Sequence, residues 1–178
     1  TWHLSAETLR RQLALQQLLF VNDYLALAIA LPDLEPSEKI QIGDSGHLDS
    51  KNTHLVIGPG TGLGVCGLLR NGKYDVPMSG EGGHMFFPVR TTQEFELIQI
   101  VSPESSGASA EWLLNGRGLE RLHTGLAKLS GGSVESMHAE EITQQALAGD
   151  AECIETLNLY CKFLGRATGD YALAYGAT

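Results

Sequence analysis

Cysteine, positive charge and long hydrophobic runs are all scarce in this sequence. Its three cysteines, Cys66, Cys153 and Cys161, are odd in number and show no CxxC spacing. This pattern argues against a disulfide framework and against a cysteine-bound zinc ion. We therefore expect reduced thiols buried in the core, as in a protein of the cytoplasm.

Negative charge outweighs positive charge. Twelve Lys and Arg residues stand against 21 Asp and Glu residues, which gives a formal net charge of −9, and the longest basic run is Arg10-Arg11. A protein that follows a nucleic-acid backbone presents clustered basic side chains. Nucleic acid is therefore not expected as a partner.

No stretch is apolar enough to predict a membrane span. The most apolar segment near the start, Leu13 to Leu31, is interrupted by polar residues, whereas a membrane helix needs about 20 predominantly apolar residues. No targeting segment is visible either. The length of 178 residues predicts one domain with a piece of another. Because the sequence starts at Thr1 and stops in a stretch typical of a turn, we expect a fragment of a longer polypeptide.

Short elements are predicted in the first third of the chain. Ser5 is suited to cap a short helix that ends near Gln17. The apolar run 18–21 has the length of a buried strand, and the Ala-rich segment 24–31 favours a helix. The prolines and polar residues of 32–52 predict a long connection between structural units.

The middle of the chain is expected to be mainly β structure. Segments 54–57 and 65–69 predict two strands joined by a glycine turn, and Asn71-Gly72 predicts a further hairpin turn. A short apolar strand is predicted over 85–87, where Pro88 ends it.

Beyond Pro88 the pattern changes to helices. We expect helices over 92–101, 108–115 with Gly116 as C-cap, 118–129, and 139–148 with Gly149 as C-cap. Steps of three and four residues indicate a last helix of about six turns with one buried stripe. The residues of this predicted stripe are Ile154, Leu157, Cys161, Leu164, Thr168, Tyr171 and Tyr175.

Asn22 and Asp23 stand between the predicted strand and the helix that follows. Open α/β sheets place ligand-binding groups at the carboxyl ends of their strands, which makes both side chains candidates for binding a ligand. Asp23 could instead only cap the helix. The two roles are compatible, and the sequence leaves both open.

The glycines of the 58–64 turn allow the backbone to approach an anion closely. Gly60, Thr61 and Gly62 could direct several N–H groups and one hydroxyl toward it. The turn lacks the lysine of a Walker loop and is not followed by the helix that the dinucleotide-binding motif requires. A plain glycine hairpin is the alternative.

Two further segments carry candidate polar ligands. Glu81 and His84 lie three residues apart on a glycine-rich turn, so both side chains could reach one small polar ligand. An exposed loop with incidental polar residues is the alternative. Glu111, in the first turn of a short helix, could bind a ligand or only interact with the helix dipole. A metal ion would need more ligands nearby.

Taken in order, four segments resemble motifs of the bacterial glucokinase family, part of the sugar-kinase, actin and Hsp70 ATPase superfamily. They are Phe20-Val21-Asn22-Asp23-Tyr24, Gly58-Pro59-Gly60-Thr61-Gly62-Leu63-Gly64-Val65, Gly80-Glu81-Gly82-Gly83-His84 and Ser109-Ala110-Glu111-Trp112-Leu113-Leu114-Asn115-Gly116. The likeness extends over nearly the whole chain. It implies an α+β fold in which residues 32–178 form most of an RNase H-like, actin-like ATPase large domain, and residues 1–31 form the end of the small α/β domain.

The resemblance also implies a reaction, the transfer of a phosphoryl group from ATP, with Mg²⁺, to the 6-hydroxyl of glucose. Asp23 would be the general base on that hydroxyl, and Asn22 would bind neighbouring hydroxyls. The residues implied at the anomeric end of the sugar are Glu81, His84 and Glu111. Those implied at the ATP phosphates are Gly60, Thr61 and Gly62.

Parts of the family pattern are missing from the chain. It lacks the N-terminal Asp-x-Gly-Gly-Thr turn that clasps phosphate, the C-terminal glycine-rich segment at the adenosine, and the Cys-rich zinc motif of related repressor-type kinases. We therefore expect no structural zinc and no kinase activity from the 178-residue chain alone. A non-enzymatic sugar-binding or regulatory module is the alternative function. The preferred hexose stays open, and a homodimer is compatible with the resemblance.

Overall fold

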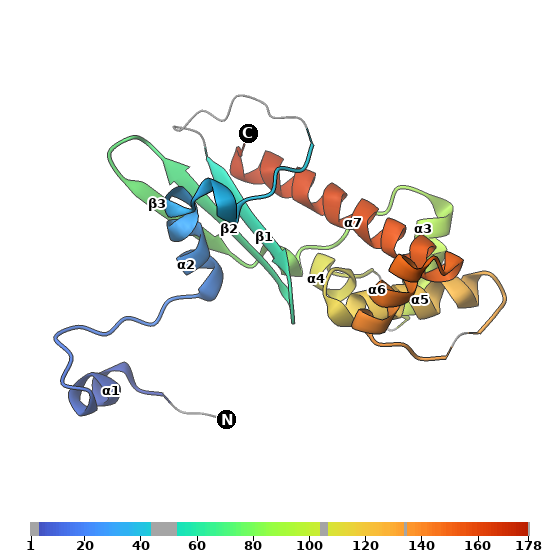
Figure 1. The fold of residues 1–178 in the computed structure, drawn as a ribbon, viewed down its shortest axis with the longest axis horizontal. Coiled ribbons are helices and arrows are strands. Elements are labelled where there is room, and N and C mark those ends of the chain that lie inside the picture. The colour runs from blue at the N-terminus through green and yellow to red at the C-terminus, as the bar shows by residue number, and fades with distance from the viewer. Residues whose placement is uncertain (1–3, 44–52, 104–106, 134, 178) are drawn as a thin grey trace.

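The computed structural model describes residues 4–43, 53–103, 107–133 and 135–177. The fold is α+β, as predicted, and consists of an N-terminal arm, a small sheet and a helical layer (Figure 1). The arm carries α1 (Ala6–Gln12), and α2 (Asp23–Ala30) covers one face of the sheet. The long α7 (Ala151–Tyr175) runs from the helical layer to the other face of the sheet.

Helix α1 begins as the sequence predicts but ends earlier. The hydroxyl oxygen of Ser5 accepts a hydrogen bond from the backbone N of Thr8 at 3.3 Å. The helix ends at Gln12, and Ala14 takes a positive φ of 50° just beyond it. No residue of α1 is buried, and the arm extends away from the sheet (Figure 1).

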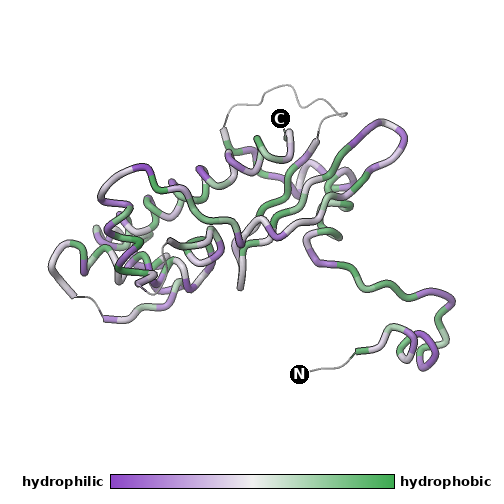
Figure 2. Tube along the Cα trace, turned by 180° about the vertical axis from the view of Figure 1, so that it is seen from behind, coloured by the Kyte–Doolittle hydropathy of each residue, from purple (hydrophilic) through white to green (hydrophobic). Residues whose placement is uncertain are grey.

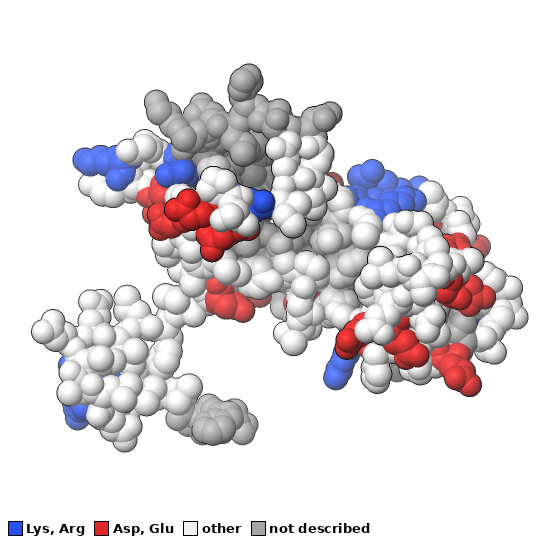
Figure 3. Space-filling model, viewed as in Figure 1, with Lys and Arg blue, Asp and Glu red and all other residues white. Residues whose placement is uncertain are grey.

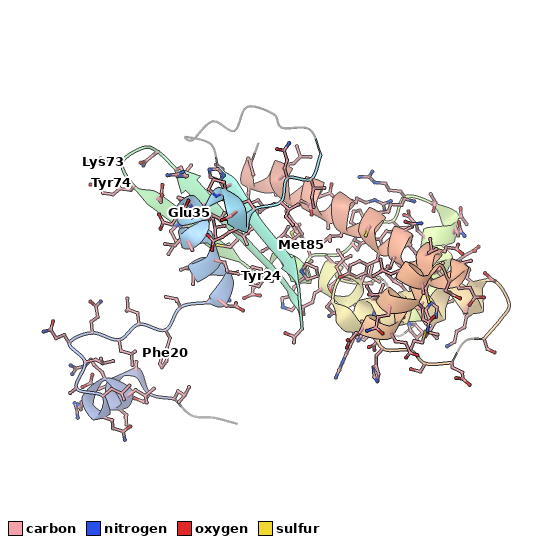
Figure 4. The ribbon with its side chains drawn as sticks, in the orientation of Figure 1. Phe20, Tyr24, Glu35, Lys73, Tyr74 and Met85 are labelled. Atoms are coloured by element: carbon pink, nitrogen blue, oxygen red, sulfur yellow. The ribbon has the colours of Figure 1, made fainter. Side chains whose placement is uncertain are left out.

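The prediction of a strand over residues 18–21 is wrong. These residues form neither strand nor helix, and Leu19, Phe20 and Val21 are 70%, 57% and 58% exposed. A strand needs a neighbouring strand for its backbone hydrogen bonds, and none within the described ranges lies beside this run. Figure 2 shows the segment as a hydrophobic part of the arm, and Figure 4 shows Phe20 away from the sheet.

Helix α2 forms as predicted and packs on the sheet. Its N-cap is Asn22, whose side-chain oxygen accepts hydrogen bonds from the backbone N of Tyr24 at 2.9 Å and of Leu25 at 3.2 Å. Ala28 is fully buried against Cys66 and Leu68. Two 3-10 turns, η1 (Leu31–Asp33) and η2 (Pro36–Glu38), begin the predicted connection, and its residues 44–52 lie outside the described residues.

The sheet has three antiparallel strands, β1 (His54–Pro59), β2 (Leu63–Arg70) and β3 (Asp75–Gly80), in that order. Both predicted hairpin turns are confirmed. Side chains alternate across β2, so Cys66 and Leu68 face α2 whereas Leu63 and Val65 join the cluster on the α7 side.

The strand predicted over 85–87 does not form as a strand. The structure has there a single β-bridge between Phe86 and Ser109. Pro88, which has no N–H, cannot extend that pairing.

Most of the predicted helices are confirmed. The helices α3 (Thr92–Val101) and α6 (Ala139–Ala148) have the predicted bounds, and Gly149 ends α6 with a φ of 100°. The helix predicted over 108–115 is only one turn long, α4 (Ala110–Leu113).

The prediction of Gly116 as a C-cap is wrong. Gly116 is the first residue of α5 (Gly116–Leu129). Asn115 is the N-cap of α5, because its side-chain oxygen accepts a hydrogen bond from the backbone N of Gly118 at 2.6 Å. The segment that resembles the end of one helix is therefore the start of the next.

The last helix has the predicted length, but its buried stripe lies on different residues. The buried residues of α7 are Cys153, Thr156, Phe163, Ala167 and Tyr171. Of the predicted stripe only Tyr171 is buried, and Cys161 is exposed, so the expectation of three core thiols holds for Cys66 and Cys153 alone. Four of the buried positions (153, 156, 163 and 167) stand one residue before predicted ones, because the face of α7 that is covered depends on where α5, α6 and β1 contact it. Burial raises the pKa of Cys153 to about 11.

Charged side chains form small separate groups on the face of the molecule that Figure 3 shows. Among the described residues, no helix is both long and apolar enough to cross a bilayer. No group of His, Cys, Asp and Glu in the same residues is arranged to hold a metal ion.

One buried ion pair joins α3 to α7. The Arg166 guanidinium donates to both carboxylate oxygens of Glu94, at 2.8 and 2.9 Å, and the two side chains are 6% and 5% exposed. Arg166 also donates to the carbonyl oxygen of Pro88 at 3.1 Å, and the backbone N of Arg90 donates to Glu94 at 2.9 Å. A bidentate pair that is also bonded to backbone fixes the geometry on both sides.

We expect the pH dependence of stability to reveal this pair. The guanidinium of Arg166 lowers the pKa of Glu94 from 4.5 to about 2, so the unfolded chain binds a proton at a higher pH than the folded chain. The contribution of Glu94 is therefore fully present above about pH 5 and is lost as the pH falls through 4.5 toward 2. Glu94→Gln should lower the free energy of unfolding at pH 7 by about 3 kcal/mol, because it leaves the buried guanidinium of Arg166 without an opposite charge beside it.

Urea unfolding at several pH values measures this effect. The exposed Glu96, on the same helix, provides the matched control Glu96→Gln. If Glu94→Gln retained the acid sensitivity of the parent chain between pH 5 and pH 2, the pair would not be its source.

Candidate functional site

The glycine turn between β1 and β2 is held by the start of α5. The backbone N of Gly60 donates to the carbonyl oxygen of Gly62 at 2.8 Å, which closes the turn. The carbonyl oxygen of Gly60 accepts a hydrogen bond from the backbone N of Gly116 at 3.3 Å. The tip of the hairpin, with Thr61, therefore lies at the N-terminal end of a helix of 14 residues.

Glu111 lies against the same hairpin. It stands in the first turn of α4, which Ser109 caps by accepting a hydrogen bond from the backbone N of Trp112 at 3.1 Å. One carboxylate oxygen, Oε2, accepts a hydrogen bond from the backbone N of Leu63 at 2.9 Å. A Cβ atom at Gly62 would collide with this carboxylate. Glu111 thus makes a long-range contact beyond any interaction with its own helix.

The turn that carries Glu81 and His84 is fixed through its glycines. It forms the 3-10 helix η3 (Gly82–His84), and the hydroxyl of Tyr171 donates to the carbonyl oxygen of Gly82 at 2.7 Å. A Cβ atom at Gly83 would collide with the carbonyl oxygen of Leu63. The side chains of Glu81 and His84 are 85% and 63% exposed, and their Oε2 and Nε2 atoms lie 3.7 Å apart. The backbone is therefore fixed, while the two polar groups remain available to a ligand.

Asn22 and Asp23 approach the hairpin from the opposite face of the sheet. The hydroxyl of Tyr24 donates to the carbonyl oxygen of Gly58 at 2.6 Å. Its ring covers Gly58 and Gly64, which are paired across β1 and β2. The start of α2 therefore lies at the same end of the sheet as the glycine turn (Figure 4).

The structure assigns the capping role to Asn22 rather than to Asp23. Asp23 is the first residue of α2, and one of its carboxylate oxygens accepts a hydrogen bond from the backbone N of Tyr24 at 2.9 Å. Asp23 is exposed. No hydrogen bond or ion pair within the described residues joins Asp23 to Glu81, His84 or Glu111.

A cavity of about 530 Å³ opens between the glycine turn, α4 and the start of α5. Gly60, Thr61 and Glu111 line it together with Gly116, Arg117 and Arg121. Helix N-termini and glycine turns present N–H groups to anions, and carboxylates are acceptors for hydroxyl groups. One cavity therefore combines groups suited to a phosphate with a group suited to a sugar hydroxyl.

Several residues of this cavity were not predicted from the sequence. The guanidinium of Arg121 lies 3.6 Å from the ring centre of Trp112 and donates to the Trp112 carbonyl oxygen at 2.9 Å. Burial, together with the nearby charge of Arg117, lowers the pKa of Arg121. The sequence carries one signal for Arg117 and Arg121: Asn115 followed by glycines is typical of a helix start as well as of a helix end. A helix that starts there places both arginines in its first turns.

Solved glucokinase structures share this α+β scaffold. A model of the glucokinase family matches residues 1–178. The chain therefore belongs to the glucokinase family, as its motifs indicate.

Individual relatives agree with this assignment. The chain is 41% identical over 177 residues to the glucokinase of Aromatoleum aromaticum strain EbN1, covering 99% of this chain and 53% of the relative. It is 37% identical over 176 residues to the glucokinase of Caulobacter sp. strain K31, covering 99% of this chain and 53% of the relative. The chain thus spans about half the length of the curated relatives it matches.

Solved structures share the fold. The crystal structure of a glucokinase from an Antarctic psychrotroph matches with a TM-score of 0.86 at 33% identity, over 99% of this chain and 55% of that one. A Balamuthia mandrillaris glucokinase, solved in complex with glucose, matches with a TM-score of 0.67 at 20% identity, over 86% of this chain and 46% of that one. The second likeness is one of fold alone.

The packing of η3 on β2 predicts different effects for two glycine substitutions. Gly83→Ala should lower the free energy of unfolding by about 1 to 3 kcal/mol, because the new methyl group meets the Leu63 carbonyl, a backbone group that cannot turn aside. Gly60→Ala should change it little, since nothing lies within 4 Å of a Cβ at Gly60. Denaturant unfolding of the two variants tests this, and equal losses would contradict the described contact.

Proposed function

We propose that this chain provides the sugar site and part of the phosphate site of an ATP-dependent kinase that phosphorylates glucose on its 6-hydroxyl. The observation that carries the proposal is the shared cavity, in which the carboxylate of Glu111 lies beside the Gly60–Gly62 turn and the start of α5. Membership of the glucokinase family makes glucose and ATP the substrates to test.

The sugar-binding groups are Glu81, His84 and Glu111, with Asn22 and Asp23 on the other side of the hairpin. A sugar offers mainly hydroxyl groups, and each hydrogen bond from a hydroxyl to a charged group contributes roughly 1.5 to 3 kcal/mol. The exposure of the two side chains leaves the Glu81 carboxylate free to accept such bonds and the His84 ring free to accept or donate them. Several contacts of this kind would reject a competitor that lacks one hydroxyl, because a carboxylate would then stay unpaired.

Asp23 is the proposed general base. A hydroxyl group is a poor nucleophile, and a carboxylate that accepts its proton as the bond to phosphorus forms accelerates the transfer by roughly 10² to 10⁴-fold. One carboxylate oxygen of Asp23 accepts from the Tyr24 backbone, which orients the group. The hydrogen bond from Tyr24 to Gly58 ties the start of α2 to the hairpin that would hold the phosphates.

The ATP phosphates are proposed to lie at Gly60, Thr61 and Gly62. The backbone N–H groups of the turn, the N-terminus of α5 and Arg117 are suited to their negative charge. When bound, ATP supplies the phosphoryl group, and Mg²⁺ neutralises part of its charge. We assign no ligand of Mg²⁺ to this chain.

For the domain arrangement, we propose that residues 32–178 form most of an RNase H-like large domain and that residues 1–31 belong to the small α/β domain. Helix α2 packs on the sheet through Tyr24 and Ala28, which makes the junction between the two parts a packed contact. The sugar would then bind between Asp23 on one side and Glu81 on the other.

We expect the chain to bind glucose, and Glu81→Gln to weaken that binding roughly tenfold, through loss of one hydrogen bond to a charged group. Isothermal titration calorimetry measures the affinity, and Glu96→Gln on the exposed side of α3 is the matched control. Unchanged affinity in Glu81→Gln would remove Glu81 from the site. Glucose binding that ATP does not influence would instead fit a non-enzymatic sugar-binding module.

The base assignment predicts a loss of turnover. In the longest natural polypeptide that contains this chain, Asp23→Asn should lower kcat by roughly 10²-fold or more while the glucose affinity changes much less. A coupled assay of glucose 6-phosphate formation measures kcat. Asp33→Asn, in η1, is the control for the loss of one carboxylate. Turnover at the parental rate would exclude Asp23 as the base.

A further inference from the structure

The turn that carries Glu81 is held only weakly by its own residues. The 3-10 helix η3 is three residues long, and Glu81, its N-cap, makes no side-chain capping bond. Two backbone hydrogen bonds of 3.0 Å close the turn, from His84 to the carbonyl oxygen of Glu81 and from Met85 to that of Gly82. Short 3-10 segments have poor hydrogen-bond geometry, and glycine loses more conformational freedom on folding than any other residue. Contacts from outside the turn therefore decide how firmly it is fixed.

Tyr171, near the end of α7, makes such a contact. The residue is 4% exposed, and its hydroxyl donates to the carbonyl oxygen of Gly82 at 2.7 Å. A Cβ atom at Gly82 would lie 3.2 Å from Cε1 of Tyr171 and 3.2 Å from Cβ of Val65. Gly82 is thus enclosed between the tyrosine ring and β2. A side chain 89 positions along the sequence fixes its carbonyl group.

A second tyrosine of α7 lies on the other side of Glu81. A Cβ atom at Gly80 would lie 2.7 Å from the hydroxyl oxygen of Tyr175, one helical turn beyond Tyr171. The glycines on both sides of Glu81 therefore lie against the same helix, while the Glu81 side chain itself is 85% exposed. The backbone at Glu81 is held from α7, and its carboxylate extends away from it.

We propose that Tyr171 is a positioning residue for sugar binding, because its hydrogen bond to Gly82 sets the direction in which the Glu81 carboxylate leaves the turn. This inference rests on the proposed function, in which that carboxylate binds a sugar hydroxyl. A group that is already oriented binds a ligand with less loss of conformational freedom than a mobile one. Tyr171 itself does not touch the sugar, since it is buried in the hydrophobic cluster on the α7 side of the sheet.

Tyr171→Phe tests the hydroxyl alone, because phenylalanine keeps the ring that packs against Gly82. We expect the full 178-residue chain with this substitution to bind glucose roughly three- to tenfold more weakly, the loss that corresponds to one hydrogen bond. Isothermal titration calorimetry measures the affinity. The matched control is Tyr160→Phe, which removes a half-buried hydroxyl from the same helix far from the turn and should bind glucose as the parent chain does.

A double-mutant cycle separates a positioning role from a merely structural one. Glu81→Gln removes the carboxylate whose direction Tyr171 sets. If Tyr171 acts through this carboxylate, Tyr171→Phe should weaken glucose binding by less than about twofold further in the Glu81→Gln chain. A substitution that only destabilises the fold would leave the affinity of the folded chain unchanged in both backgrounds.

If Tyr171→Phe prevents folding, Gly82→Ala tests the same contact from the turn. The φ of Gly82 is not positive, so alanine is compatible with its backbone. The added methyl group presses on the Tyr171 ring and on Val65 and displaces the turn from both. We expect glucose binding to weaken at least threefold, by roughly the loss of one hydrogen bond. Parental affinity in this variant would then overturn the inference.

The inference is also overturned if Tyr171→Phe folds and binds glucose as tightly as the parent chain, or if it loses as much affinity in the Glu81→Gln chain as in the parent. Neither result affects the proposed function, because the parent chain still binds glucose. A parent chain that fails to bind glucose would instead refute the proposed function together with the positioning role.

Discussion

The close contact between η3 and the first residue of β2 is the constraint on which the candidate site depends. Gly83 lies against the carbonyl oxygen of Leu63, and the backbone N of Leu63 donates to the carboxylate of Glu111. The hydroxyl of Tyr171 holds Gly82 from the side of α7, and burial raises the pKa of Tyr171, so this hydroxyl remains a donor at neutral pH. One backbone position thus fixes η3, α4 and the glycine hairpin relative to each other.

This arrangement separates rigid backbone from available side chains. The glycine turn is held at both ends, by Gly116 and by the β1–β2 pairing, while Glu81 and His84 are exposed above a fixed turn. Preorganised groups bind a ligand with less loss of conformational freedom than mobile ones. Tyr24 plays the corresponding part on the other face of the sheet, where it anchors the start of α2 at the same end.

Local sequence patterns predicted most helices and turns well, but they predicted poorly which other elements each one contacts. Hairpin turns and helix caps depend on a few neighbouring residues, so Asn71-Gly72, α3 and α6 were predictable from the sequence. The run 18–21 has the composition of a strand, but strand formation depends on a neighbour that the pattern does not contain. The buried stripe of α7 was mispredicted for a similar reason, since burial there depends on contacts made far along the chain. The start of α5 was mispredicted for a local reason, because Asn115 followed by glycines is typical of a helix start as well as of a helix end. The contact of Glu111 with Leu63, across 48 residues, left no local signal at all.

The central claim is that the glycine turn, which binds phosphate, and Glu111, which binds sugar, serve one reaction. The most direct measurement is amide NMR of the chain with glucose 6-phosphate, which carries a phosphate and the sugar hydroxyls in one molecule. We expect the amide signals of Gly60, Thr61 and Gly62 to shift together with that of Leu63, whose N–H donates to Glu111, and with one common affinity. Shifts confined to one of these groups, or two different affinities, would contradict the account.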